Sequence, residues 1–213
     1  MAILKNGING GFSGKIGNVV GSMYGDKCVL KSRPKPSQKN KIGSTAQNRY
    51  RLRFKNLHSF LKPLLYFIRV GFNLEGRANE LSAYNAAKSY NLLHAVAEDG
   101  TLDYAKILVS KGQLPNAQQI VLQQDDSGFH FSWDNPPLPD NTRLSDQFMM
   151  LAYPLDSIDL YYSLSSNRRR QRQDSLPIPA YESGKNFNIW VAFISDDRQA
   201  ISNSVYLGEH CFG

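Results

Sequence analysis

Residues 186–194 read Asn-Phe-Asn-Ile-Trp-Val-Ala-Phe-Ile, nine positions without a charge, a proline or a glycine. Successive side chains of a strand point to opposite faces, so this segment puts four large apolar side chains on one face. They are Phe187, Ile189, Val191 and Phe193. Residues 129–133 alternate in the same way, with Phe129, Phe131 and Trp133 on one face. Two apolar strand faces that both need cover indicate two sheets packed against each other.

Short runs of this β type recur through the last hundred residues, separated by clusters of Asp, Gly, Asn and Pro. The runs are residues 119–123, 129–133, 148–153, 160–164, 186–194 and 200–207. Their spacing predicts a small antiparallel β-sandwich. Burying each large apolar side chain stabilises such a core by roughly 1.5–3 kcal/mol, so the sandwich needs no disulfide.

Upstream of the sandwich the apolar pattern changes to helical spacing. Ser44 and Gln47 have the spacing of a capping box, and apolar residues then recur every three or four positions up to Ile68. Pro63 removes a backbone donor, which predicts a kink or break near Lys62. A second helix is predicted from Ser82 to about Glu98, and residues 105–110 are expected to form a short strand.

The beginning of the chain is rich in glycine, with seven glycines between Gly7 and Gly25. A hairpin is predicted in which residues 18–23 pair with residues 28–32 across a turn at 24–27. Residues 33–41 contain two prolines and form an extended basic connector. The sequence therefore predicts an α+β fold: an N-terminal β-hairpin with helices in residues 1–115, followed by a C-terminal antiparallel β-sandwich in residues 116–213.

Positive charge is concentrated in the first part of the chain. Residues 1–55 contain twelve Lys or Arg and one acid, whereas residues 56–213 contain thirteen bases and seventeen acids. Such asymmetry favours a partner of opposite charge, and packing of the basic front on the acidic remainder is the alternative. The candidate residues for binding a partner or a nucleic acid are Lys31, Arg33, Lys35, Lys39, Lys41, Arg49, Arg51 and Arg53.

Motifs for catalysis, cofactors and metals do not appear in the sequence. The Gly14-Lys15 pair lacks the spacing of a phosphate-binding loop, the four His are isolated, and no Gly-x-Ser-x-Gly elbow occurs. No catalytic, cofactor-binding or metal-binding residue is therefore predicted. The favoured function is a non-enzymatic binding or structural protein that recognises a macromolecular partner. The alternatives are nucleic-acid binding through residues 27–55 and an enzyme with a composite site between the two predicted domains.

Location is predicted from the absence of targeting signals. The first residues lack the apolar core of a signal peptide, and no apolar run approaches the roughly 20 residues needed to span a bilayer. The two cysteines, Cys28 and Cys211, lie far apart in the sequence and suit a reducing compartment. We therefore expect a cytoplasmic protein.

Several segments resemble a bacterial family of unknown function and similar length. They are residues 14–21, 45–54, 109–114, 131–133 and 202–208. The last hundred residues also resemble an immunoglobulin or fibronectin type III sandwich, through residues 131–133 and 148–153 and the strands around Trp190 and Tyr206. No pair of cysteines bridges these strands, so the likeness is one of architecture. Neither resemblance implies an activity, because sandwich folds serve many functions.

Overall fold

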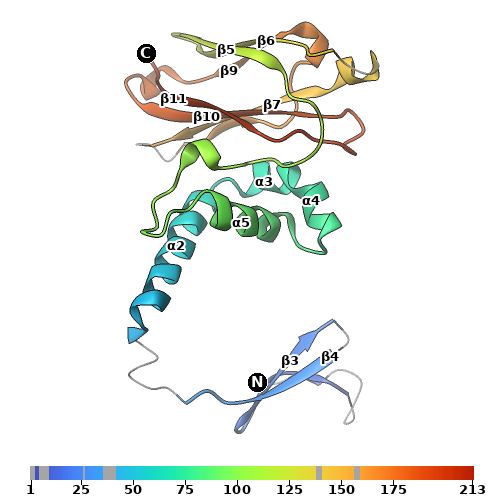
Figure 1. Cartoon of the computed structure of the whole chain (residues 1–213), viewed down its shortest axis with the longest axis vertical. Helices are drawn as coiled ribbons and strands as arrows, with labels where there is room; N and C mark the ends of the chain where they lie inside the picture. Colours follow the sequence, from blue (N-terminus) through green and yellow to red (C-terminus); the bar gives the residue numbers. More distant parts are fainter. Residues whose placement is uncertain (1–2, 5–9, 26, 36–41, 138–140, 156–158) are drawn as a thin grey trace. The chain divides into compact units, whose positions relative to one another are not determined.

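A computed structural model describes residues 3–4, 10–25, 27–35, 42–137, 141–155 and 159–213 (Figure 1). The chain divides into two compact units, residues 1–46 and residues 47–213. We call them the N-terminal unit and the body. The boundary predicted after residue 115 falls inside the body, where helices and sandwich share a hydrophobic core.

The N-terminal unit is a four-stranded antiparallel sheet in the order β1-β2-β3-β4. Its strands are β1 (Ile3–Leu4), β2 (Phe12–Ile16), β3 (Val19–Tyr24) and β4 (Lys27–Ser32). The predicted hairpin is confirmed as β3 and β4, with Val19 opposite Ser32 and Tyr24 opposite Lys27. The predicted pair is thus part of a larger sheet, because the glycine-rich segment before it also forms strands.

Four α-helices open the body. They are α2 (Thr45–Leu61), α3 (Leu65–Gly71), α4 (Asn73–Ala78) and α5 (Ala83–His94). The predicted break at Lys62 and Pro63 is confirmed, because α2 ends at Leu61 and α3 begins at Leu65. Ser82 caps α5 by accepting a hydrogen bond from the Asn85 N–H at 3.2 Å. The helix ends at His94, four residues before the predicted end, and α4 was not predicted.

The strand predicted at residues 105–110 is wrong. Tyr104–Lys106 form one turn of 3₁₀-helix (η1), Ile107 is extended, and residues 107–110 belong to no strand. Side chains replace the missing ladder: the Asn91 amide bonds both backbone groups of Leu108, at 2.8 and 2.9 Å, and the Ser204 hydroxyl accepts from the Val109 N–H at 2.9 Å. The sequence pattern of this segment resembles a strand because Ile107 and Val109 are buried.

The rest of the body is a β-sandwich. Its strands are β5 (Gln118–Asp125), β6 (Gly128–Asp134), β7 (Gln147–Pro154), β8 (Tyr161–Ser163), β9 (Gln173–Pro177), β10 (Asn186–Ile194) and β11 (Val205–Cys211). One sheet has the order β5-β6-β9 and the other the order β11-β10-β7-β8. These are the A-B-E and G-F-C-C′ arrangements of an immunoglobulin-like sandwich, so the predicted α+β fold and sandwich are confirmed. Strand β9 was not predicted, because its sequence is mostly polar.

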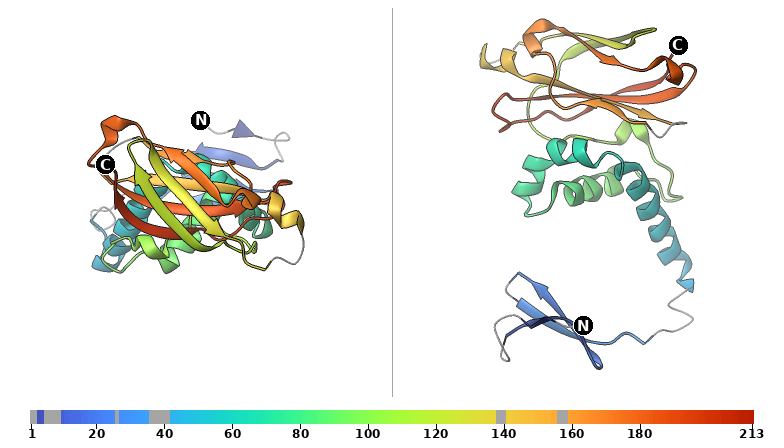
Figure 2. Two further views of the ribbon diagram at one scale, coloured as in Figure 1. Left: turned by 90° about the horizontal axis from the view of Figure 1, so that it is seen from above. Right: turned by 180° about the vertical axis from the view of Figure 1, so that it is seen from behind.

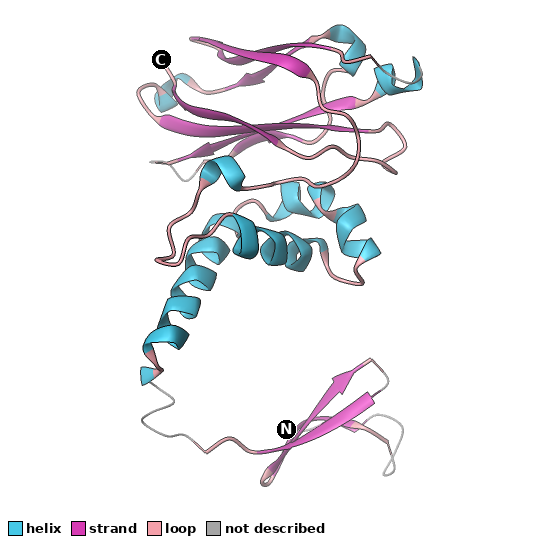
Figure 3. Ribbon diagram, in the orientation of Figure 1, coloured by secondary structure: helices cyan, strands magenta, loops and turns pink. Residues whose placement is uncertain are grey.

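The sheet β11-β10-β7-β8 lies between two hydrophobic cores. Phe187, Ile189, Val191 and Phe193 face the other sheet and pack with Phe129, Phe131 and Trp133, as predicted. Trp190 and Leu151 point the opposite way and pack with the helices. The body thus has three layers, two of strands and one of helices (Figures 1, 2 and 3). Both faces of the middle sheet are covered.

Candidate functional site

The sheet of the N-terminal unit has two chemically different faces. Gly14, Ile16, Val19, Gly21 and Leu30 share one face through the register of β2, β3 and β4. The same alternation places Phe12, Met23 and Cys28 there, and none of these eight residues is charged. We call this the apolar face. The Phe12 ring lies over Gly21, where an added Cβ would be 2.6 Å from the ring, so Gly21 leaves room for this aromatic contact.

The opposite face of the same sheet carries lysines, and we call it the basic face. Lys15, Val20 and Lys31 are direct neighbours across three strands, and Lys27 lies opposite Tyr24. Lys15, Lys27 and Lys31 are exposed, and Tyr24 retains 65% of its exposed surface. Three exposed cations on one face, one of them opposite an accessible aromatic ring, provide both charge and a stacking surface for an anionic ligand.

Part of the predicted basic set lies on or next to this face. Lys31 belongs to β4, and Arg33 and Lys35 follow it in an exposed extended segment. The Arg33 N–H donates to the Asn18 carbonyl at 2.7 Å, which continues the pairing beyond the end of β4. Lys39 and Lys41 lie outside the described residues.

The three arginines of α2 have different surroundings. The Arg49 guanidinium pairs with the Glu98 carboxylate at 2.9 Å. Arg53 donates to the carbonyls of Leu92 and Val96, at 2.8 and 2.9 Å, near the end of α5, where carbonyl groups have no partner within the helix. Arg51 is exposed and has a 3.4 Å contact with Asn48. Two of the three predicted arginines, Arg49 and Arg53, therefore bind groups outside their own helix.

Lys15, Lys27 and Tyr24 were not among the predicted site residues. The sequence signal was the alternation within residues 12–16 and 27–32: Lys15 lies opposite in face to Gly14 and Ile16, and Lys27 shares a face with Lys31. The prediction counted charges along the chain and did not sort them by strand face. The register of the three strands brings Lys15 and Lys31, sixteen positions apart in the sequence, to the two sides of Val20 on the same face.

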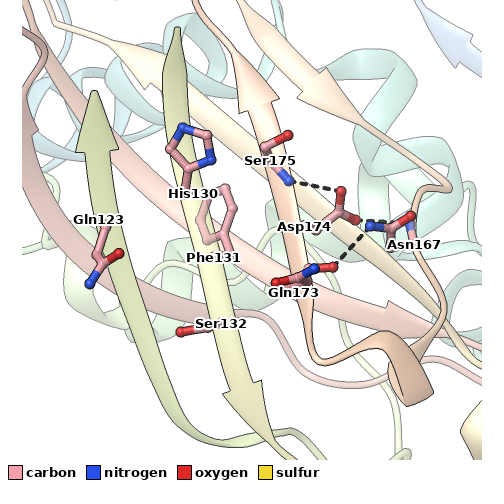
Figure 4. Close-up of a pocket in the computed structure, with 8 residues that line it drawn as sticks. All are labelled: Gln123, His130, Phe131, Ser132, Asn167, Gln173, Asp174 and Ser175. Atoms are coloured by element: carbon pink, nitrogen blue, oxygen red, sulfur yellow. Dashed lines mark hydrogen bonds between the residues drawn. The ribbon is translucent and has the colours of Figure 1, made fainter. Parts of the chain in front are cut away.

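A polar hollow of about 340 Å³ lies on the sandwich, along the outer side of β5, β6 and β9 (Figure 4). Its lining includes Gln123, His130, Ser132, Gln173 and Ser175. Asp174 lies at its edge and accepts from the N–H groups of Asn167 and Ser175, both at 2.8 Å. These groups can form hydrogen bonds with a polar molecule, but the hollow contains no exposed aromatic ring.

A serine, a histidine and an aspartate meet beside this hollow. The Ser127 hydroxyl donates to Asp125 at 2.5 Å, and His130 Nε2 lies 2.9 Å from Asp125 and 3.2 Å from the Ser127 Oγ. Hydrogen bonds from Ser127 and then from His130 hold the pKa of the Asp125 carboxyl well below its usual range. Both contacts use the same ring nitrogen, whereas a catalytic triad needs one nitrogen for each partner. The group therefore stabilises the β5–β6 turn.

Within the described ranges, no three His, Cys, Asp or Glu side chains are grouped so that they could hold a metal ion. No helix in the same part of the chain is both long enough and apolar enough to cross a bilayer.

Comparison with protein families gives one assignment. The sequence model of DUF6266, a family of unknown function, matches residues 11–208. The chain belongs to this family. The DUF6266 match includes β2 to β4 as well as nearly all of the body, so the two-faced sheet falls within the family region. A comparison with curated proteins finds no match.

Proposed function

We propose that this DUF6266 protein is a non-enzymatic binding protein whose N-terminal unit binds an anionic macromolecular partner. One observation carries the proposal: residues 1–46 have eight bases and one acid, and the described lysines of the strands β2 to β4 lie on one face of the sheet. Residues 47–213 have seventeen bases and seventeen acids. The net charge of +7 therefore belongs to the N-terminal unit, which favours an external anionic partner over an acidic body.

The body fits the role of a scaffold. Its middle sheet is covered on both faces, and its two cores require no ligand to be complete. Its polar hollow lacks both a triad and an exposed ring. These features favour recognition by the N-terminal unit over chemistry within the body.

Charge reversal on the basic face tests the proposal. The full chain and the triple variant Lys15→Glu, Lys27→Glu, Lys31→Glu are titrated against a fluorescent single-stranded oligonucleotide, a duplex and poly-glutamate. The matched control reverses Lys62, Arg77 and Arg170, which are exposed on the body. Both triple variants have the same net charge, so they differ only in where charge is lost.

We expect the variant of the basic face to lose binding and the body variant to keep most of it. Equal losses would mean that net charge alone governs binding. Failure of the unmodified chain to bind any of the three polyanions at low salt would refute the proposal.

Nucleic acid is the second, narrower candidate, and the position of Tyr24 favours it. An exposed ring opposite a lysine, Lys27, on the basic face is a surface on which an unpaired base stacks, with a contribution of about 1–3 kcal/mol per base. Tyr24→Leu should weaken single-strand binding about fivefold or more and change duplex binding little. Tyr66→Leu is the control, because Tyr66 is equally exposed but lies on the body.

The salt dependence of binding separates nucleic acid from other anions. Each phosphate contact contributes about 0.7–0.9 to the slope of log K against log salt, so removing three lysines should lower the slope by about 2–3. A slope that stays unchanged in the triple variant would exclude the basic face as the phosphate-binding surface.

A further inference from the structure

Among the described residues of the N-terminal unit, none forms a second layer over its apolar face. Ile16 retains 50%, Val19 39% and Leu30 60% of their exposed surface. An amphipathic sheet is stable when its apolar face packs against a second layer, and the only helical residues in the described part of this unit are Ile42 and the start of α2 at Thr45, too few to form one. The face therefore needs a partner.

We infer that the apolar face packs against the apolar face of a second copy of this chain. The proposal uses the face opposite to the lysines and does not depend on the proposed function.

The distribution of charge fits a second copy. Because the described lysines of the three long strands all lie on the other face, two copies joined through their apolar faces bring no charges into the contact. Stacked sheets lie about 10 Å apart, so the two basic faces would lie outside the pair, separated by more than the Debye length of about 8 Å at physiological ionic strength. The pair would form despite the charge on each unit.

The shape of the face also fits a second copy. Aligned packing of two twisted sheets lets identical faces meet around a two-fold axis, which is the commonest symmetry of homodimers. Gly14 and Gly21 are the small positions of this face, and Phe12 fills the space above Gly21. The surface that remains consists of Ile16, Val19, Met23, Cys28 and Leu30, with Ser32 opposite Val19, and all six are uncharged side chains that can take part in sheet-to-sheet contact.

The body is a poorer match for this face. Both faces of its middle sheet are already buried, and the outer side of β5-β6-β9 carries Gln123, His130 and Ser132. On α2, the Phe54 ring stacks with His58 and lies 4.3 Å from the Lys88 ammonium. Among its described residues the body thus offers no open apolar sheet face.

Paired substitutions on neighbouring residues test the inference in the full chain. Ile16→Gln with Leu30→Gln alters the apolar face, and Lys15→Gln with Lys31→Gln alters the basic face of the same two strands. Sedimentation velocity over a concentration series measures self-association. We expect the unmodified chain to dimerise, the apolar-face variant to associate at least ~10-fold more weakly, and the basic-face variant to dimerise as before.

The two cysteines give a second measurement on the unmodified protein. Cys28 lies on the apolar face and Cys211 on β11 of the body, and both are exposed in the single chain. Labelling by a maleimide should become slower at Cys28 as protein concentration rises and stay constant at Cys211. This measurement remains informative even if a variant fails to fold.

Three outcomes would overturn the inference. A monomer in which Cys28 reacts rapidly at every concentration would leave the face uncovered. Protection of Cys28 that does not depend on concentration would mean that the same chain covers the face. A dimer unaffected by the Ile16 and Leu30 substitutions would place the contact elsewhere.

Discussion

The N-terminal unit and the body use similar residues in opposite ways. In the body, apolar strand faces are buried in pairs, and Trp190, Phe148 and Phe187 are inaccessible to solvent. In the N-terminal unit, Ile16 and Leu30 alternate with lysines in the same manner but stay exposed. Alternation therefore sets the two faces of a strand, but a second layer is needed before either face is buried. The body contains that second layer, and the inferred dimer would supply one to the N-terminal unit.

The largest expected effect separates the two units by stability. Trp190 packs with Phe60 and Tyr206 and donates from Nε1 to the Ile107 carbonyl at 3.2 Å, so Trp190→Ala should lower the free energy of unfolding by about 3–5 kcal/mol. Leu30→Ala on the exposed face should change it by less than about 0.5 kcal/mol in the monomer. Urea denaturation followed by circular dichroism measures both. Equal losses of stability in the two variants would contradict the difference in burial between Trp190 and Leu30.

A buried arginine gives the next largest effect. Arg169 is inaccessible, donates to the Pro115 carbonyl at 2.7 Å, lies 3.6 Å from Asp146 and covers the Phe193 ring at 3.8 Å. Burial lowers the pKa of its guanidinium to about 10, which still leaves it charged at neutral pH.

Arg169→Ala should therefore cost about 3 kcal/mol, because it removes the buried cation next to the buried Asp146 carboxylate and leaves the partly exposed Arg143, at 3.8 Å, as an ion-pair partner. The neighbouring Arg170→Ala should cost less than about 0.5 kcal/mol, since Arg170 is exposed. The two melting curves decide whether the arginine cluster of residues 168–172 stabilises the sandwich or is a solvated loop. Similar melting temperatures for both variants would remove the structural role of Arg169.

Much of the fold could be predicted because its signals are local. The alternation in β6 and β10, the capping serine of α5 and Pro63 each specify their own backbone. Strand β9 could not be predicted, because its position in the sheet depends on pairing with β6 more than forty residues earlier. The strand predicted at residues 105–110 was wrong for a similar reason, because partners far away in the sequence decide its conformation. The backbone N–H groups after η1 donate to the side chains of Asn91 and Ser204.

The candidate site was predicted only in part. Counting charges identified Lys31, Arg33 and Lys35, but the partners of Arg49 and Arg53 lie 39 to 49 positions away in the sequence. A helical arginine that faces solvent and one that caps another helix look identical in the sequence. Alternation in the sequence tells which neighbours share a strand face with Lys15 and with Lys27. Showing that the two lysines lie on the same face of the sheet needed the register of β2 with β3.

A smaller effect should separate the arginines of α2. Arg53→Met should lower the free energy of unfolding by about 1–2 kcal/mol, because the carbonyls of Leu92 and Val96 lose a charged donor. Arg51→Met should change stability by less than about 0.5 kcal/mol. If α2 contributes to binding of a polyanion, the Arg51 variant should be the one that weakens it. An Arg53→Met variant with normal stability and reduced polyanion binding would mean that Arg53 belongs to the binding surface.

Lowering the pH should have the smallest effect on stability. It acts on the body, because seventeen of the eighteen Asp and Glu residues lie in residues 47–213. The pKa of Asp125 is lowered by hydrogen bonds from Ser127 and His130, so the folded chain prefers its charged form. Its contribution to stability is therefore present above the unfolded pKa, near 4, and is lost as pH falls through the lower folded pKa. NMR titration should show that the pKa of Asp125 lies below its usual range, and Ser127→Ala should raise that pKa. The free energy of unfolding of the Asp125→Asn variant should differ from that of the unmodified chain less at low pH than at neutral pH. A constant difference would mean that the carboxylate charge does not stabilise the β5–β6 turn.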